Sequence, residues 1–166
     1  MRRITLLIAS MALIVCVAAS VALAVEKTCQ ANTDCFGTNQ ADTLTGSDGN
    51  DRIFGLGGPD VIFGLGDDDL LSGGSGDDEV RGGLGEDEIR GGAGDDELRG
   101  AAGADEIFAG VGNDTVFGGA GNDFIDVSGD QDAGFQDEVF CGPGTEDVVL
   151  ADENDILHGC ELVNPT

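Results

Sequence analysis

Aspartate recurs at one fixed place, every nine residues, through the middle of this 166-residue chain. The nine members are Asp51, Asp60, Asp69, Asp78, Asp87, Asp96, Asp105, Asp114 and Asp123. Glycine fills most of the other fixed places, so backbone carbonyls are expected around each carboxylate if the turns stack. Oxygen-only sites suit hard cations, and Ca²⁺ accepts six to eight oxygens at about 2.3–2.6 Å. These aspartates therefore predict metal binding, and calcium is favoured because magnesium needs a smaller octahedral cage and keeps its water.

An aliphatic side chain follows each of these aspartates by two residues. The set is Ile53, Ile62, Leu71, Val80, Ile89, Leu98, Ile107, Val116 and Ile125. Because glycine reaches positive φ at little steric cost, the glycine-rich part of each repeat is expected to turn. The rest is expected to form a strand of about three residues whose middle side chain points inward. A fixed period of this length predicts a repeat architecture.

A chain that reverses at every turn needs two repeats, or eighteen residues, to return to its starting edge. Stacked coils would then form two facing parallel sheets. One sheet would carry Ile53, Leu71, Ile89, Ile107 and Ile125, and the other Ile62, Val80, Leu98 and Val116. The aspartates would lie on the two long edges, above one another in the pairs 51/69, 60/78, 69/87, 78/96, 87/105, 96/114 and 105/123.

The charge of this segment opposes its folding. Between Gly46 and Asp126 there are 20 acidic residues against 4 arginines, a net charge of −16. With one aliphatic side chain per repeat, the segment has the composition of a disordered chain unless counterions bind. Seven pairs holding about one divalent ion each would contribute roughly +14, if the turns stack as expected. Folding is therefore expected to require a cation.

The pattern resembles the RTX, or haemolysin-type, calcium-binding repeat family. The resemblance rests on nine consecutive copies over residues 46–126, about half of the chain. Two glycines are fixed in the repeat. Ala109 replaces the first of them in one copy, Asp67 replaces the second in another, and Pro59 and Ala104 occupy a variable turn position. The resemblance implies an all-β fold, a parallel β-roll (β-solenoid), whose repeat aspartates and turn carbonyls bind several Ca²⁺ ions.

The N-terminal residues 1–24 are predicted to form a signal peptide. Two arginines precede an apolar run, and Ala22-Leu23-Ala24 supplies a small-x-small cleavage site. The mature protein is then secreted, extracellular and not inserted in a membrane. The apolar run is also long enough to span a bilayer, so an uncleaved anchor is the competing interpretation.

After this cleavage four cysteines remain, and an even number in an exported chain predicts disulfides. Three connectivities are possible, and we favour Cys29–Cys35 with Cys141–Cys160. The second pair is nineteen residues apart, close to one coil, so its members are expected on neighbouring coils. Zinc binding is disfavoured because the chain has a single histidine and no Cys-x-x-Cys.

The two ends are expected to differ from the repeats. Residues 25–45 form an N-terminal segment with a degenerate first copy, Asp42-x-Leu44. Residues 127–166 are predicted to form an irregular, disulfide-pinned cap over the open end of the solenoid. The repeat pattern resumes there loosely at Asp137, Asp147 and Asp155.

The residue after each core position predicts what lies on the outer faces. It is phenylalanine near the ends of the array, at Phe54, Phe63, Phe108 and Phe117. It is arginine in the middle, at Arg81, Arg90 and Arg99, accompanied by Glu79, Glu88 and Glu97. The middle is therefore expected to be a solvated surface of ion pairs. The phenylalanines are either covered by the end segments or form a docking patch.

Several classes of function are disfavoured. His158 is solitary, and paired acids recur in turn after turn as structural ligands would, so no enzyme is predicted. No Lys-Ser/Thr follows the glycines, and Lys+Arg 7 against Asp+Glu 33 argues against nucleic acid. We predict an exported protein that folds on binding calcium. The alternative is an adhesion or cell-envelope module that calcium makes rigid; the sequence names no protein or surface partner.

Overall fold

The computed structural model describes residues 25–129 and 134–165, which contain sixteen β-strands and no helix. The predicted signal peptide, residues 1–24, lies outside the described residues. Within the described ranges, no helix is long and apolar enough to cross a membrane.

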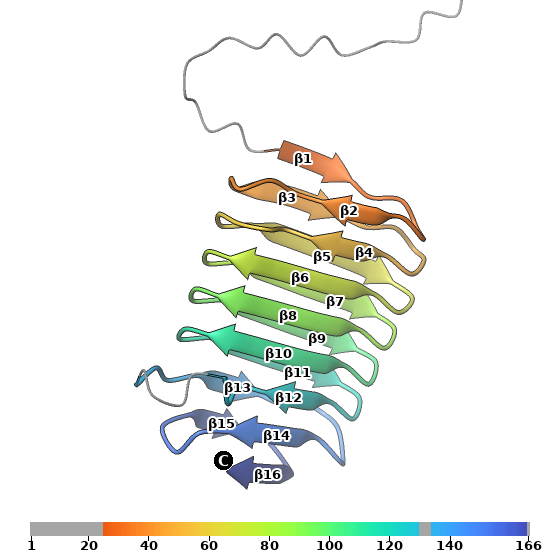
Figure 1. Cartoon of the computed structure of the whole chain (residues 1–166). Helices are drawn as coiled ribbons and strands as arrows, with labels where there is room; N and C mark the ends of the chain where they lie inside the picture. The colour runs from red at the N-terminus through yellow and green to blue at the C-terminus, as the bar shows by residue number, and fades with distance from the viewer. Residues whose placement is uncertain (1–24, 130–133, 166) are drawn as a thin grey trace, which may run out of the picture.

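The strands form two parallel sheets that alternate along the chain (Figure 1). The odd sheet contains β1 (Val25–Thr28), β3 (Asp42–Thr45), β5 (Val61–Gly66), β7 (Glu79–Leu84), β9 (Glu97–Ala102), β11 (Thr115–Ala120), β13 (Glu138–Phe140) and β15 (Ile156–His158). The even sheet contains β2 (Asp34–Phe36), β4 (Arg52–Phe54), β6 (Leu70–Ser75), β8 (Glu88–Ala93), β10 (Glu106–Val111), β12 (Phe124–Asp126), β14 (Val148–Ala151) and β16 (Leu162–Pro165). The predicted β-solenoid is confirmed.

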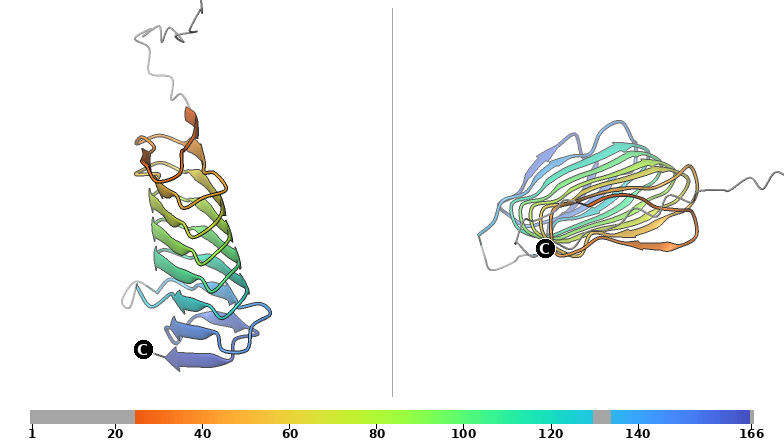
Figure 2. Two further views of the ribbon diagram at one scale, coloured as in Figure 1. Left: turned by 90° about the vertical axis from the view of Figure 1, so that its right-hand side faces the viewer. Right: turned by 90° about the horizontal axis from the view of Figure 1, so that it is seen from above.

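The register follows the eighteen-residue coil. Ile53 pairs with Leu71 in the even sheet, and Ile62 pairs with Val80 in the odd sheet. All nine repeat aliphatic side chains are 0 % exposed and form one core between the sheets. The predicted division of these residues between two sheets is confirmed, and Figure 2 shows the flattened coils stacked along one axis.

Most central strands are six residues long, so the prediction of about three was wrong. The extra residues belong to the glycine-rich half of the repeat, where Gly74 pairs with Gly92 and Ser75 with Ala93. Gly92 has φ +123°, and a Cβ there would collide with the carbonyl of Gly74. Glycine therefore lets the backbones of neighbouring turns pair, which extends both sheets to the edges.

Both ends are more regular than expected. β13–β16 continue the two sheets, and two of the coils there are longer than eighteen residues. The stacked aspartates are 23 residues apart from Asp114 to Asp137 and 24 from Asp123 to Asp147. At the other end, β1 and β2 add a coil that the repeat pattern did not predict.

Both predicted disulfides are present, Cys29–Cys35 and Cys141–Cys160. The Cα atoms of the second pair are 5.2 Å apart. Its members follow β13 and β15, which are neighbours in the odd sheet. The expectation that the second pair joins neighbouring coils is confirmed.

The outer faces carry the expected ion pairs, Arg81–Glu79, Arg90–Glu88 and Arg99–Glu97. The phenylalanines are half-buried by neighbouring coils. Phe54 stacks on Phe36 and Phe117 on Phe140, so residues of the end segments do cover these two rings. Arg81 lies 5.5 Å from the ring centroid of Phe63, and Arg90 5.5 Å from that of Phe108. Arginine thus covers the remaining two rings.

Candidate metal centre

The repeat aspartates form two ladders, one along each edge of the solenoid. All nine are buried, with 1 % to 4 % of their surface exposed. The backbone N–H of each donates to the carboxylate Oδ1 of the aspartate one coil further on. The N–H of Asp69 lies 2.9 Å from Oδ1 of Asp87, and that of Asp78 lies 2.8 Å from Oδ1 of Asp96. The predicted stacking of aspartates eighteen residues apart is therefore present.

The ladders extend beyond the nine predicted residues. Asp42 donates from its N–H to Oδ1 of Asp60, and Asp114 and Asp123 donate to Oδ1 of Asp137 and Asp147. Asp42, Asp137 and Asp147 were not among the predicted ligands. Their Asp-x-aliphatic motifs were visible in the sequence. Asp42 keeps the nine-residue register but was interpreted as a degenerate copy, and extra residues before Asp137 and Asp147 hid the register of those two.

The second carboxylate oxygen, Oδ2, has no hydrogen-bond partner in most of these turns. The set is Asp60, Asp69, Asp78, Asp87, Asp96, Asp105, Asp123 and Asp147. A buried carboxylate oxygen without a partner is strongly unfavourable, because burial removes the water that would solvate its charge. These atoms therefore mark places where the fold needs a positive group.

Each such oxygen in the repeats faces a space that we call the cradle. The cradle lies between Oδ2, the first glycine of its own turn, and a backbone carbonyl of the next coil. At Gly82, an added Cβ would meet Oδ2 of Asp87 at less than 3.0 Å and the Gly100 carbonyl oxygen at 2.9 Å. At Gly64 it would meet Oδ2 of Asp69 and the Gly82 carbonyl in the same way. Glycine is thus required so that two oxygens from neighbouring coils can approach each other.

The oxygens of the cradle fit a hard cation. Among the described residues, no three His, Cys, Asp or Glu side chains gather in a group that could hold a metal. The carboxylate oxygens lie instead beside backbone carbonyls. Such mixed oxygen sets are typical of calcium sites, because carbonyls complete a coordination that a few carboxylates begin.

Burial raises the pKa of the ladder carboxyls. It raises the pKa of Asp69, Asp96 and Asp105 to about 7, and that of Asp78 and Asp87 to about 6. Loss of water is the largest cause, a backbone N–H from the preceding coil lowers the pKa, and stacked carboxylates raise it further. Without a cation, these carboxyls of the folded ladder therefore take up protons near pH 6 to 7, well above the range of an ordinary aspartate.

Two of the nine predicted ligands lie in turns that are built differently. Oδ2 of Asp51 already accepts hydrogen bonds from the N–H of Ser47 at 2.6 Å and its Oγ at 2.9 Å. In the turn of Asp114, buried Ala109 brings a methyl group to the place of the first glycine. A cation therefore fits these two turns less well than it fits the others.

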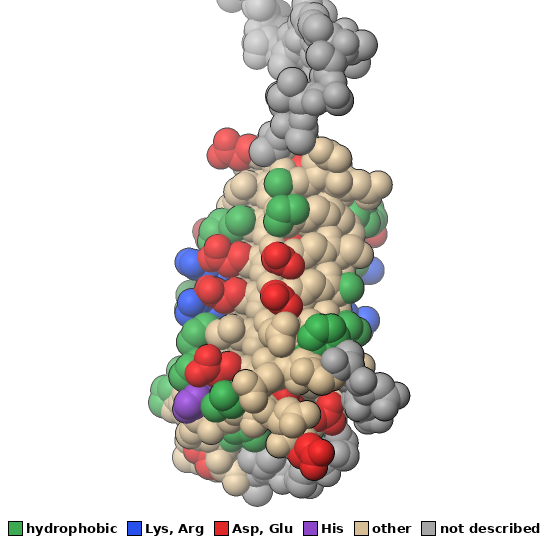
Figure 3. Space-filling model, turned by 90° about the vertical axis from the view of Figure 1, so that its left-hand side faces the viewer, with side chains coloured by type: hydrophobic (Ala, Val, Ile, Leu, Met, Phe, Trp, Pro, Cys, Tyr) green, Lys and Arg blue, Asp and Glu red, His purple; other side chains and the backbone are tan. Residues whose placement is uncertain are grey.

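A row of exposed carboxylates lies outside each ladder. Asp95 Oδ1 accepts from the N–H of Asn113 at 2.9 Å, and Asp68 Oδ1 from that of Glu86 at 2.9 Å. The hydrogen bonds from the backbone and the side chain of Asn113 lower the pKa of Asp95. Figure 3 shows acidic side chains in rows along the edge where even strands turn into odd strands.

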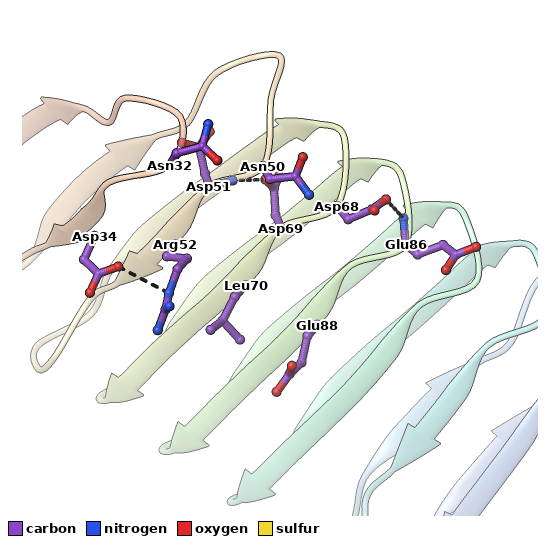
Figure 4. A pocket seen from close by; sticks show the side chains of 10 residues that line it. All are labelled: Asn32, Asp34, Asn50, Asp51, Arg52, Asp68, Asp69, Leu70, Glu86 and Glu88. Carbon is purple, nitrogen blue, oxygen red and sulfur yellow. Dashed lines mark hydrogen bonds and ion pairs between the residues drawn. The ribbon is translucent and has the colours of Figure 1, made fainter.

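On the opposite edge, a cleft of about 480 Å³ opens beside the first coils (Figure 4). Asp68 and Glu86 line it together with the buried ladder residues Asp51 and Asp69. Each edge therefore carries an exposed acidic row beside its buried ladder, and the outer rows raise the local negative charge.

A family model for the RTX calcium-binding nonapeptide repeat matches residues 36–71, 55–89, 72–107, 90–125 and 99–132, which together span more than half of the chain. The chain belongs to this RTX family. The matched RTX range begins before Gly46 and so includes the opening copy at Asp42. A comparison of this RTX chain with curated proteins found no match.

Proposed function

We propose that this RTX chain is an exported protein whose folding is coupled to Ca²⁺ bound between stacked turns. The family and the β-solenoid fold make it a calcium-binding repeat protein. The observation that carries the proposal further is the row of buried Oδ2 atoms without hydrogen bonds. Calcium, when bound, supplies positive charge there and joins one coil to the next.

The proposed ligands combine side-chain and backbone oxygens. The carboxylates are those of Asp60, Asp69, Asp78, Asp87, Asp96, Asp105 and Asp123, which have an Oδ2 without a hydrogen bond. The carbonyl of the next coil completes each cradle, as that of Cys141 does opposite Asp123. Asp51 and Asp114 are weaker candidates because Ser47 and Ala109 alter their turns.

Coupling to folding follows from the charge and the core. Each repeat buries one aliphatic side chain, and residues 46–126 carry a net charge of −16. The cradles exist only when coils are stacked, so an unfolded chain cannot offer them. The free energy of binding is then free energy of folding, and calcium shifts the equilibrium by mass action.

A calcium titration followed by circular dichroism tests this coupling. We expect β-structure to appear as calcium rises to about 10⁻⁴–10⁻³ M, the range of other extracellular calcium modules. Magnesium at the same concentrations should have a much smaller effect. Full β-structure in a chelator at neutral pH would refute the coupling, and an equal response to magnesium would refute the preference for calcium.

Export is the second part of the proposal. The strand β1 begins at Val25, immediately after the predicted cleavage site at Ala22-Leu23-Ala24. We expect sequencing of the mature protein to start at Val25 and cell fractionation to place it outside the cytoplasm. An intact chain starting at Met1 in the membrane fraction would contradict this. That result would favour the cell-envelope module.

A further inference from the structure

The first two turns of the ladders differ from those that follow. Oδ2 of Asp42 accepts hydrogen bonds from the N–H of Thr38 at 2.5 Å and from its Oγ at 2.9 Å. Ser47 makes the same two bonds to Asp51. In both turns the oxygen that faces the cradle is already bonded to two donors.

Backbone conformation explains why these two turns are closed and those of the central repeats are not. In the later repeats, the residue at the place of Thr38 and Ser47 has a positive φ. These residues are Leu56, Leu65, Gly74, Gly83, Gly92, Ala101, Gly110 and Gly119. Thr38 and Ser47 do not adopt this conformation. Their N–H therefore points at the carboxylate, whereas the N–H of Gly119 donates to the Cys141 carbonyl of the next coil.

The other parts of the cradle are present in both turns. A Cβ on Gly37 would lie 2.8 Å from Oδ2 of Asp42 and collide with the Gly55 carbonyl. A Cβ on Gly46 would lie 2.7 Å from Oδ2 of Asp51. These oxygens are arranged as in the later cradles, so the hydrogen-bond donors are what distinguishes the first two turns.

We propose that Thr38 and Ser47 each close a cation site, so that the N-terminal end folds without calcium while the central turns from Asp60 to Asp105 require it. This inference rests on the proposed function. A backbone N–H turns its positive end toward Oδ2 and repels a cation there. The same bonds stabilise the buried carboxylate, as a cation does elsewhere.

The surroundings of the two aspartates agree with this division. Both oxygens of Asp42 are bonded, since Oδ1 accepts from the N–H of Val25 at 3.1 Å. Oδ1 of Asp51 has no partner, because the N–H of Thr33 in the preceding coil donates to Gln30. The turn of Asp42 is therefore the more completely closed of the two. The Cys29–Cys35 disulfide constrains the same end of the solenoid.

A calcium-independent end would act as a template. In a solenoid each coil contacts mainly its neighbours, so an ordered coil lowers the cost of ordering the next one. Folding would then start at β1–β4 and proceed toward β12 as ions bind.

Counting bound ions tests the closed sites directly. The probe is Ca²⁺ alone, at saturation, with native mass spectrometry of the full mature chain. Thr38→Gly and Ser47→Gly remove the hydroxyl and free the backbone to take a positive φ, so each should gain one ion. Thr38→Ala and Ser47→Ala keep the blocking backbone conformation and should gain none. Ser75→Gly makes the same substitution in a later turn, one place further along the repeat than Ser47, and is the control that should also leave the count unchanged.

Hydrogen exchange of the unaltered protein provides a second test that needs no variant. In a chelator at neutral pH, amides of residues 42–54 should exchange at least about tenfold more slowly than those of residues 70–111. Uniform exchange without calcium would overturn the proposal, and so would unchanged ion counts in both glycine variants. Either result would leave the calcium-binding function intact, whereas no binding by the unaltered protein would refute that function itself.

Discussion

Asp87→Ala should shift calcium-induced folding to higher calcium concentration, whereas Glu88→Ala should change it little. Both substitutions remove one negative charge, so long-range electrostatics changes equally. Asp87 contributes Oδ2 to a cradle, and its Oδ1 accepts the buried N–H of Asp69. Glu88 points outward and pairs with the exposed side chain of Arg90. A comparison of the two variants thus distinguishes calcium bound at specific ligands from calcium held as diffuse counterions.

The expected size of the Asp87 effect follows from the groups left behind. A buried N–H without an acceptor costs about 1–3 kcal/mol, and an exposed ion pair is worth about 0–1 kcal/mol. Because several ions bind together, a loss of about 3 kcal/mol in folding free energy raises the calcium concentration at the folding midpoint roughly twofold. Loss of a calcium ligand raises it further. Parallel calcium titrations of the two variants, followed by circular dichroism, measure this. Equal shifts would refute the stacked-aspartate site.

Removing calcium at neutral pH should unfold the central coils, and acid should restore much of their structure. The carboxyls of Asp69, Asp96 and Asp105 have a pKa of about 7 in the metal-free fold, against 3.8 for an ordinary aspartate. A pKa raised by folding means that the folded state binds more protons than the unfolded state. The stability from these groups is therefore fully present below about pH 3.8 and is lost as pH rises through 6 to 7.

Circular dichroism of the chelated protein between pH 8 and about pH 4.5 measures this effect. The β-signal should rise on acidification, with most of the change between pH 7 and 5. A sample at pH 8 in 1 M potassium chloride is the control, because salt screens general repulsion but does not protonate a buried acid. A signal that stays flat with pH, or that salt restores equally well, would show that the buried aspartates do not govern folding.

The sequence was sufficient to predict the architecture because one strict period set both the core and the edges. Ile53 and Leu71 are eighteen residues apart, and that spacing alone puts them side by side in one sheet. The stacking of Asp69 on Asp87 follows from the same arithmetic. The disulfide of Cys141 with Cys160 was predictable because it spans one coil.

The details that were missed depend on backbone conformation. Leu56 and Leu65 adopt a positive φ that such residues rarely take, because pairing with the neighbouring coil fixes the backbone there. Ser47, at the same place in the repeat, does not, and only the structure shows that its N–H and hydroxyl reach Asp51. Asp137 was passed over as a ligand because the longer coil before it breaks the nine-residue count.

The eighteen-residue coil also limits how such a chain can change its length. Gain or loss of two repeats adds or removes one coil, and all remaining side chains keep their orientation. Gain or loss of a single repeat would move each later strand to the opposite sheet, so the arginine and phenylalanine columns would continue on the other face. The 23 residues from Asp114 to Asp137 and the 24 from Asp123 to Asp147 show a third route, since a coil can gain residues while its aspartates still stack. Proteins related to this chain are thus expected to differ from it by whole coils or by longer turns.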